Sequence, residues 1–172
     1  MFDLPLNTKR GWGNPMARSV AVEQSRAIPV AVEDAFSRTL PLPLPVVFSR
    51  WYGPIPPIKG VREQTGEWDA AGQTRTVIMV GGGSMREELT SVDPPRSFGY
   101  TLSNIKGPLA PLVSSVEGKW SFSPAGTGTR VSWQWVIHPK SGVTARALPV
   151  LGRIWKGYAR RALETLSAQL VG

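Results

Sequence analysis

The last thirty residues, Ser141 to Val171, constrain the fold of this chain more than any other stretch. Apolar side chains recur there at spacings of three and four, which places them on one face of a single long helix. These residues are Leu148, Leu151, Trp155, Tyr158, Ala162, Leu166 and Leu170. Pro149 lies within the stretch, so we expect a kink or a false start there, with the regular helix beginning near Val150. A helix with one apolar face needs an apolar surface to cover.

The residues before this helix alternate between apolar and polar, which is the pattern of half-buried strands. The clearest case lies within 129–138, where Val131, Trp133, Trp135 and Ile137 alternate with polar residues. Short turns separate the strands, so we expect an antiparallel meander with one face against the helix. The seven predicted strands are Ser19–Ile28, Val61–Trp68, Gln73–Val80, Met85–Val92, 98–102, Val113–Ser123 and Thr129–His138.

A proline-rich stretch separates the first two strands. Residues Val32–Phe36 predict a short helix, with acids in its first turn where the helix dipole favours them. Prolines then recur among apolar residues from Leu40 to Ile58, too densely for a long helix. We interpret this stretch as a buried, stiff connector around a second short helix, Val46–Trp51, with Trp51 and Tyr52 packed under the sheet. The alternative is a polyproline ligand for a partner domain.

Together these elements predict one α+β domain. The chain has 172 residues, of which 41% are hydrophobic and 19% charged, as expected for one globular domain. Residues 1–18 are predicted to form an N-terminal arm and residues 19–172 the folded domain. Neither a signal-peptide core nor a membrane span is apparent, so we expect a cytoplasmic location. The absence of cysteine excludes disulfides, thiolate metal sites and cysteine nucleophiles.

The chain is basic, with 20 Lys and Arg against 12 Asp and Glu and a net charge of +8. Such a surface can attract anionic lipid, nucleic acid or an acidic partner, or it can be inert. The densest group is Arg153, Lys156, Arg160 and Arg161 on the final helix, which a solvated helix face also explains. Weak contact with an anionic membrane surface is one option. Nucleic acid is not an expected partner because no basic-aromatic motif is present, and no pattern predicts an oligomeric state.

Three local patterns lie on the predicted strands and turns. They are Arg-Glu-Glu-Leu-Thr-Ser-Val-Asp-Pro-Pro-Arg at 86–96, Gly-Lys-Trp-Ser-Phe-Ser-Pro at 118–124 and Gly-Thr-Arg-Val-Ser-Trp at 128–133. With the order of elements, they make residues 19–172 resemble the START-like (SRPBCC) superfamily, which includes polyketide cyclases and dehydrases. The resemblance implies a helix-grip fold, in which a curved antiparallel seven-stranded sheet wraps around a long C-terminal helix, with two short helices after the first strand. It also implies a cavity between sheet and helix.

The resemblance further implies a mobile loop at the mouth of that cavity. Residues Gly81, Gly82, Gly83 and Ser84 lie where members of the superfamily carry such a gate. Three consecutive glycines give the backbone freedom to move. An ordinary glycine-rich hairpin turn explains the same residues.

Side chains on the faces assigned inward are the candidates for contact with a ligand. Tyr and Trp offer a large apolar surface with a polar tip, although core packing explains each of them as well. In the superfamily the position matching Glu87 often points into the cavity. Arg75 is its candidate partner, because a buried carboxylate is costly unless it is paired or protonated; the alternative places both residues at the surface. The predicted pocket residues are Arg75, Val77, Met79, Glu87, Leu89, Tyr100, Leu102, Trp120, Val131, Trp133, Trp135, Leu151, Trp155 and Tyr158.

No catalytic residue, metal site or cofactor is predicted. His138 is the only histidine, and we expect it to be exposed or structural. One histidine without cysteine does not make a zinc site. There is no nucleophile elbow and no pair of acids with the spacing of a glycosidase site.

The sequence therefore supports three functions, in descending order. The first is binding or transport of a small hydrophobic ligand, such as a lipid, a quinone or a polyketide-like molecule. The second is a polyketide cyclase or aromatase-like enzyme, in which Tyr100, Tyr158, Glu87 or Arg75 would polarise carbonyls or move protons. The third, motivated by the net charge, is a basic interaction protein that acts at a ribosome or membrane surface.

Overall fold

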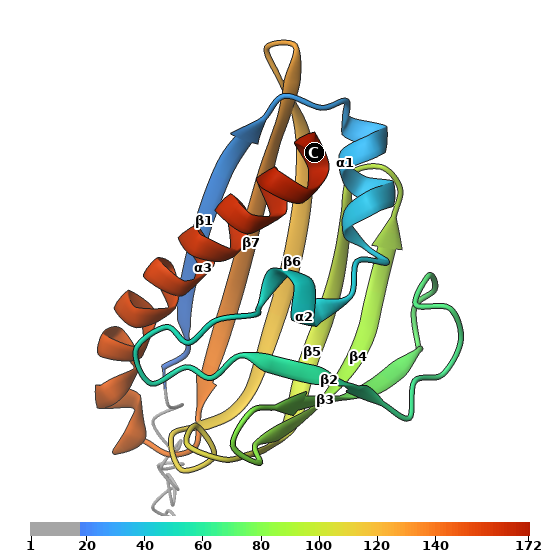
Figure 1. Cartoon of the computed structure of the whole chain (residues 1–172). Helices are drawn as coiled ribbons and strands as arrows, with labels where there is room; N and C mark the ends of the chain where they lie inside the picture. The colour runs from blue at the N-terminus through green and yellow to red at the C-terminus, as the bar shows by residue number, and fades with distance from the viewer. Residues whose placement is uncertain (1–17) are drawn as a thin grey trace, which may run out of the picture.

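A seven-stranded antiparallel sheet wraps around a long C-terminal helix (Figure 1). The computed structural model describes residues 18–172, so the predicted N-terminal arm lies, except for its last residue, outside the described residues. The strands lie in the order β1-β7-β6-β5-β4-β3-β2. Their bounds are β1 Val20–Ile28, β2 Ile58–Arg62, β3 Thr74–Met79, β4 Ser84–Asp93, β5 Ser97–Lys106, β6 Val113–Ala125 and β7 Gly128–Pro139.

The helices are α1 (Val32–Thr39), α2 (Leu44–Val47) and α3 (Leu148–Val171), with a 3-10 turn at Thr144–Ala147 before α3. The predicted α+β helix-grip fold, with two short helices after the first strand, is confirmed. Pro149 lies in the first turn of α3, where its missing N–H would have no partner in any case. The regular helix begins at Leu148, ahead of the start expected near Val150, and the 3-10 turn lies before the proline rather than at it. No helix within residues 18–172 is long and apolar enough to cross a membrane.

The inner face of the sheet follows the alternation read from the sequence. On β7, Val131, Trp133 and Ile137 are buried, and on β6 the buried positions include Trp120 and Phe122. Trp120 lies directly opposite Trp133 across these two strands, and their rings stack with centroids 4.9 Å apart. The large aromatic side chains of neighbouring strands therefore gather on the face that α3 covers.

Small residues let α3 approach its neighbours closely. A Cβ at Gly152 would lie 3.0 Å from the side chain of Val22 on β1, and one at Gly157 would overlap the ring of Tyr52. At the other end of the helix, Arg38 of α1 donates hydrogen bonds to the carbonyl oxygens of Gln169 and Leu170, at 2.8 and 2.7 Å. These carbonyls have no partner within the helix, so Arg38 ties α1 to the end of α3.

Two predictions for the proline-rich connector are wrong. The second short helix is α2, Leu44–Val47, instead of Val46–Trp51, because Pro45 occupies the first turn, where proline is tolerated. Trp51 does not lie under the sheet, since its side chain is 55% exposed. Tyr52 packs against α3 at Gly157, which a pattern without a helical or strand period gave no means to predict.

The first strand after the connector also differs from its prediction. It was expected at Val61–Trp68 and is found at β2, Ile58–Arg62. Glu63 has a φ of 54° and Trp68 a φ of 61°, and such left-handed conformations end an extended backbone. Residues 63–73 therefore form a loop, which carries Trp68 back into the core with only 4% of its surface exposed.

Candidate ligand-binding cavity

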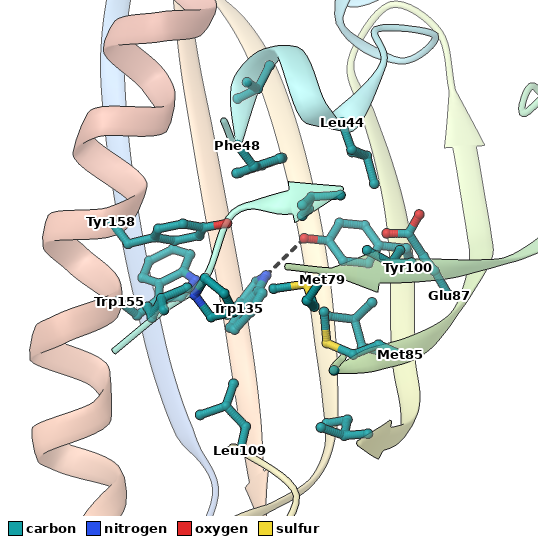
Figure 2. A pocket seen from close by; sticks show the side chains of 18 of the residues that line it. Leu44, Phe48, Met79, Met85, Glu87, Tyr100, Leu109, Trp135, Trp155 and Tyr158 are labelled. Carbon is teal, nitrogen blue, oxygen red and sulfur yellow. Dashed lines mark hydrogen bonds between the residues drawn. The ribbon is translucent and has the colours of Figure 1, made fainter. Parts of the chain in front are cut away.

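A cavity of about 600 Å³ lies between the inner face of the sheet, α3 and the connector that follows α1 (Figure 2). Its volume falls in the range of small-molecule sites, roughly 300–1,000 Å³, and most of its wall is apolar. Many of the predicted pocket residues lie on this wall: Arg75, Val77, Met79, Glu87, Tyr100, Leu102, Trp120, Trp133, Trp135, Leu151, Trp155 and Tyr158.

Leu89 and Val131 were expected in the wall and do not belong to it. Both are fully buried in the core. Val131 lies opposite Phe122, whose ring meets Phe36 of α1 at 5.5 Å between centroids. Leu89 lies two residues beyond Glu87 along β4, toward the end of the sheet that α1 covers (Figure 1). Alternation identifies the inner face of a strand, but it does not tell where along the strand the cavity ends.

The predicted gate residues form the turn between β3 and β4. Gly81 and Gly83 line the cavity, whereas Gly82 and Ser84 do not, and Ser84 is already the first residue of β4. The turn is closed by a hydrogen bond from the backbone N–H of Met79 to the carbonyl of Gly83, at 2.8 Å. Gly81 and Gly82 have φ values of 93° and 95°, which glycine adopts without strain.

Sequence reasoning missed the share of the wall that the connector and two loops contribute. Phe48, for example, stacks on Tyr158 with ring centroids 5.6 Å apart and meets Trp133 at 5.4 Å. The apolar residues between the prolines signalled burial but not the side on which they would be buried. The missed lining residues include Leu40, Leu42, Leu44, Val47, Phe48, Ile55, Ile58, Trp68, Met85, Phe98, Leu109, Leu112 and Ile154.

A hydrogen-bonded aromatic group lies at the centre of the cavity wall. The hydroxyl oxygen of Tyr100 on β5 accepts hydrogen bonds from the indole N–H groups of Trp133 and Trp135 on β7, at 2.8 and 2.9 Å. The ring of Tyr100 reaches these partners across β6, where Gly118 has no side chain to obstruct it. Burial, and secondarily the negative charge of Glu87, raises the pKa of Tyr100 well above its ordinary value, so its hydroxyl is protonated at neutral pH.

Two more residues with polar groups line the cavity from α3 (Figure 2). Trp155 is only 1% exposed. Its indole N–H is buried and has no hydrogen-bond partner within residues 18–172. Tyr158 lies beside it, and burial followed by the nearby Tyr100 raises the pKa of Tyr158 far above its ordinary value. The Tyr158 hydroxyl is therefore neutral and can donate a hydrogen bond, whereas the Trp155 N–H is closed off from the cavity.

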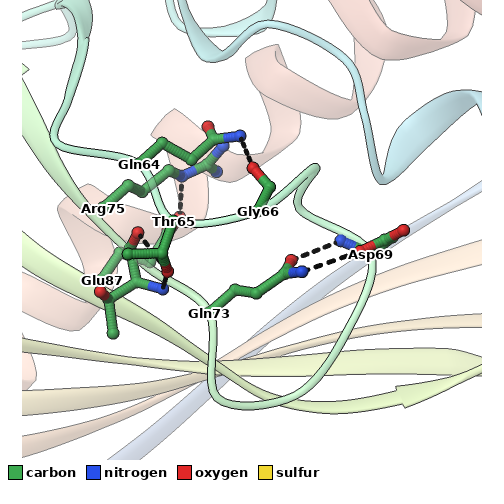
Figure 3. Close-up of polar contacts among 8 residues, drawn as sticks. Gln64, Thr65, Gly66, Asp69, Gln73, Arg75 and Glu87 are labelled. Atoms are coloured by element: carbon green, nitrogen blue, oxygen red, sulfur yellow. Dashed lines mark hydrogen bonds and ion pairs between the residues drawn. The ribbon is translucent and has the colours of Figure 1, made fainter.

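Arg75 on β3 and Glu87 on β4 form a buried ion pair in the wall (Figure 3). The guanidinium Nε donates to a carboxylate oxygen of Glu87 at 2.6 Å, and the guanidinium lies 3.8 Å from the ring centroid of Trp68. Burial raises the pKa of Glu87 and outweighs the opposing charge and hydrogen bond of Arg75. Of the two arrangements open from sequence, the structure has the interior one.

The loop that carries Trp68 is held by its own polar contacts (Figure 3). The side chain of Gln73 accepts a hydrogen bond from the backbone N–H of Asp69 at 2.7 Å and donates one to the Asp69 carboxylate at 2.8 Å. Gln64 donates to the carbonyl of Gly66 at 3.0 Å. These bonds fix the loop in the conformation that places Trp68 against Arg75.

Some lining residues are also exposed, and we call this group the cavity mouth. Within it, Trp51, Val80 and Val150 are large apolar residues with 55%, 38% and 60% of their surface exposed. Exposed apolar side chains grouped around an opening are a common mark of an interaction site. The cavity mouth consists of Trp51, Pro54, Val80, Gly81, Lys106, Pro108 and Val150.

His138 lies away from the cavity. Its ring nitrogen Nε2 is 2.8 Å from a carboxylate oxygen of Glu117 on the neighbouring strand, and Glu117 is exposed. The part of the chain that the structure describes contains no group of three or more His, Asp or Glu residues arranged to hold a metal ion.

Comparison with known protein families agrees with this fold and cavity. Residues 19–171 match the model of the family described as polyketide cyclase / dehydrase and lipid transport. The chain belongs to this family. The membership in the START-like superfamily predicted from the sequence is thereby confirmed, and the family covers all seven strands and all but the last residue of the described domain. Comparison with curated proteins finds no significant match.

Solved structures share the fold of this polyketide cyclase/dehydrase family member. The crystal structure of Ara h 8.0201 is similar to it with a TM-score of 0.62 and 15% sequence identity, over 90% of this chain and 99% of that one. A protein from Nitrosospira multiformis is similar with a TM-score of 0.59 and 17% identity, over 88% of this chain and 96% of that one. At these identities the similarity concerns the fold.

Proposed function

We propose that this protein binds a small hydrophobic molecule in the cavity and carries or senses it. The observation that carries the proposal is the cavity of about 600 Å³ with a mostly apolar wall. A ligand that buries about 300 Å² of apolar surface there would gain about 7 kcal/mol, less the cost of ordering. The family description, which includes lipid transport, agrees with a lipid, a quinone or a polyketide-like ligand.

Enzymatic cyclisation of a polyketide is the weaker alternative. Among the described residues that line the cavity, Glu87 is the one carboxylate, and Arg75 already holds it. General acid–base catalysis needs a group that exchanges its proton near neutral pH. Burial moves the pKa values of Tyr100 and Tyr158 away from neutrality. Burial also raises the pKa of Glu87, but Arg75 holds this carboxylate, so the tyrosines of the wall serve as donors for positioning.

Native mass spectrometry of the purified protein, followed by organic extraction, tests the proposal. We expect a stoichiometric adduct of lipid-like mass, and reduced binding in Met79→Trp, which places a large ring at a half-buried position in the wall. Ile78→Trp is the matched control, because Ile78 is the adjacent residue on β3 and does not line the cavity. The proposal fails if no adduct forms and if lipids, quinones and aromatic polyketides leave the tryptophan fluorescence unchanged.

We propose the gap between two loops as the entrance. The β3–β4 turn and the loop 107–111 meet there, and a Cβ at Gly107 would lie 3.0 Å from the Cα of Gly83. Separation of the two loops would widen the cavity mouth at Gly81 and Pro108, and Gly81 is one of the predicted gate residues.

A second proposal concerns where the ligand is taken up, namely at an anionic membrane surface. Exposed Trp51, Val80 and Val150 surround the cavity mouth. Next to them α3 exposes Arg153 and Lys156, and along its whole length it carries a single acid, Glu164. Aromatic and apolar side chains beside basic ones are the composition of surfaces that lie in a lipid headgroup region. The net charge of +8 adds a long-range attraction.

Sedimentation with vesicles that contain phosphatidylserine tests this contact. Basic residues near an anionic surface contribute about 1 kcal/mol each, so Arg153→Gln with Lys156→Gln should weaken binding about thirtyfold. High salt should abolish it. Arg26→Gln with Arg130→Gln is the control, because these exposed residues lie at the far end of β1 and β7 from the mouth. Equal losses in both double variants would indicate a nonspecific effect of net charge and contradict a docking surface at the mouth.

A further inference from the structure

Hydrogen-bond donors outnumber free acceptors at the centre of the cavity. The hydroxyl oxygen of Tyr100 already accepts two bonds, from Trp133 and Trp135. A hydroxyl oxygen has two lone pairs and one hydrogen, so the lone pairs of Tyr100 are occupied. Its hydrogen is not donated to any residue within 18–172. The free function of this hydroxyl is therefore donation into the cavity.

A second free donor lies against the same pair of tryptophans. The ring of Trp155 meets those of Trp133 and Trp135 at 5.0 and 5.6 Å between centroids. Its N–H has no partner among the described residues. A buried donor left unpaired costs about 1–3 kcal/mol, but this N–H is closed off from the cavity itself, so the Tyr100 hydroxyl is the donor considered for a ligand. The carboxylate in this wall, Glu87, has one of its two oxygens engaged by Arg75.

Resting on the proposed function, we infer that the cavity selects apolar molecules that carry a carbonyl oxygen, and that the Tyr100 hydroxyl donates a hydrogen bond to that oxygen. Apolar ketones, esters and quinones satisfy this requirement. Plain hydrocarbons would leave the donors unpaired, and amines would bring further donors to a wall that already has too many.

The geometry makes Tyr100 the principal donor. Its hydroxyl is fixed between two indole N–H groups, so little orientational freedom is lost when a ligand binds. Bonds accepted by an oxygen strengthen the bond that its own hydrogen donates. Burial also raises the pKa of Tyr100, which keeps the hydrogen in place across the physiological range. Tyr158 has a free hydroxyl as well, but no residue orients it among those described.

Two matched probes test the inference: 2-methyl-1,4-naphthoquinone and 2-methylnaphthalene, which share a ring system and differ in the carbonyl groups. Tryptophan quenching gives both Kd values, and their ratio removes differences in general hydrophobicity and folding. We expect Tyr100→Phe to reduce the preference for the quinone about fivefold to tenfold, as one hydrogen bond is lost. The freed indole groups do not replace it, because the ligand oxygen lies one hydrogen-bond length beyond the Tyr100 hydroxyl.

Tyr52→Phe is the control, because Tyr52 packs against α3 and does not line the cavity, and its ratio should change less than about twofold. Infrared spectra of the wild-type protein with carbonyl-labelled quinone give a readout that needs no variant. The carbonyl stretch should move to lower frequency than in hexane. An unchanged ratio in Tyr100→Phe, equal changes in both variants or an unshifted stretch would overturn the carbonyl inference while leaving hydrophobic binding intact. If neither probe binds the wild-type protein, the inference and the proposed function fail together.

Discussion

Replacing Gly118 by alanine is expected to lower the free energy of unfolding by about 3–5 kcal/mol and to abolish ligand binding. Gly118 on β6 lies directly opposite Tyr100 on β5, and an added Cβ would overlap the Tyr100 ring. The ring has no room to yield, because its hydroxyl is held by Trp133 and Trp135. Overpacking of a core costs about 1–3 kcal/mol, and each lost hydrogen bond adds about 1 kcal/mol.

Urea unfolding and tryptophan fluorescence measure the two effects together. The fluorescence should change even without ligand, since two indole N–H groups lose their acceptor. Gly142→Ala is the matched control, because Gly142 is exposed and an added Cβ there meets nothing within 4 Å. If Gly118→Ala is as stable as this control and binds ligand normally, Tyr100 is not confined in the way described, and its role as the oriented donor is wrong.

The long helix and strands of this fold were predictable because their buried residues recur at regular spacings along the sequence. The apolar residues of α3 recur at helical spacing, and all those named from the sequence, from Leu148 to Leu170, are buried. On strand β7 the period of two holds for Val131, Trp133 and Ile137, which are buried, whereas Trp135 is half-buried. The connector has no period, since its prolines interrupt every regular pattern, and its second helix and the position of Trp51 were predicted wrongly. The end of β2 depends on the left-handed backbone conformation of Glu63. A glutamate in the sequence gives no indication of this conformation.

The cavity was predictable to the extent that it follows from strand faces. Alternation placed Tyr100 on the inner side, whereas the resemblance to the superfamily suggested Glu87, with Arg75 as its candidate partner, and all three lie in the wall. Alternation also placed Leu89 there, which lies beyond the end of the cavity. The hydrogen bonds of Tyr100 depend on β5 and β7 being brought together across Gly118 of β6. No local pattern encodes a contact between residues more than thirty positions apart, so the free donor emerges only from the folded chain.

The buried pair of Arg75 and Glu87 should show the second large effect. We expect either single substitution to lower the free energy of unfolding more than the double substitution does. Removing one partner of a buried pair leaves the other charge uncompensated, at about 3–5 kcal/mol, whereas apolar replacement of both is often close to neutral. We therefore expect Glu87→Leu and Arg75→Met each to lower the free energy of unfolding strongly, and the double variant to recover most of the loss. Asp93→Leu with Arg96→Met, an exposed pair at 2.8 Å, is the control and should show little coupling.

The two single variants should respond to pH in opposite directions. In Arg75→Met the remaining carboxyl can take up a proton. For a group with an ordinary pKa of 4.5, protonation costs about 3.4 kcal/mol at pH 7 and about 0.7 at pH 5. The penalty of this variant should therefore shrink on acidification. In Glu87→Leu the remaining guanidinium cannot release its proton at any usable pH, so no such relief is available.

The direction of the pH effect in Glu87→Leu follows from how the stability of the wild-type protein depends on pH. Burial raises the pKa of Glu87, so the contribution of this carboxyl to stability is fully present below its ordinary pKa and is lost as the pH rises through the folded value. The wild type gains stability on acidification that Glu87→Leu cannot gain, and the penalty of this variant should be larger at about pH 5 than at about pH 7. Urea unfolding at both values measures the difference. A penalty that shrinks instead would mean that Arg75 outweighs burial and lowers the pKa of Glu87, with the pair acting as a stabilising ion pair rather than a tolerated one.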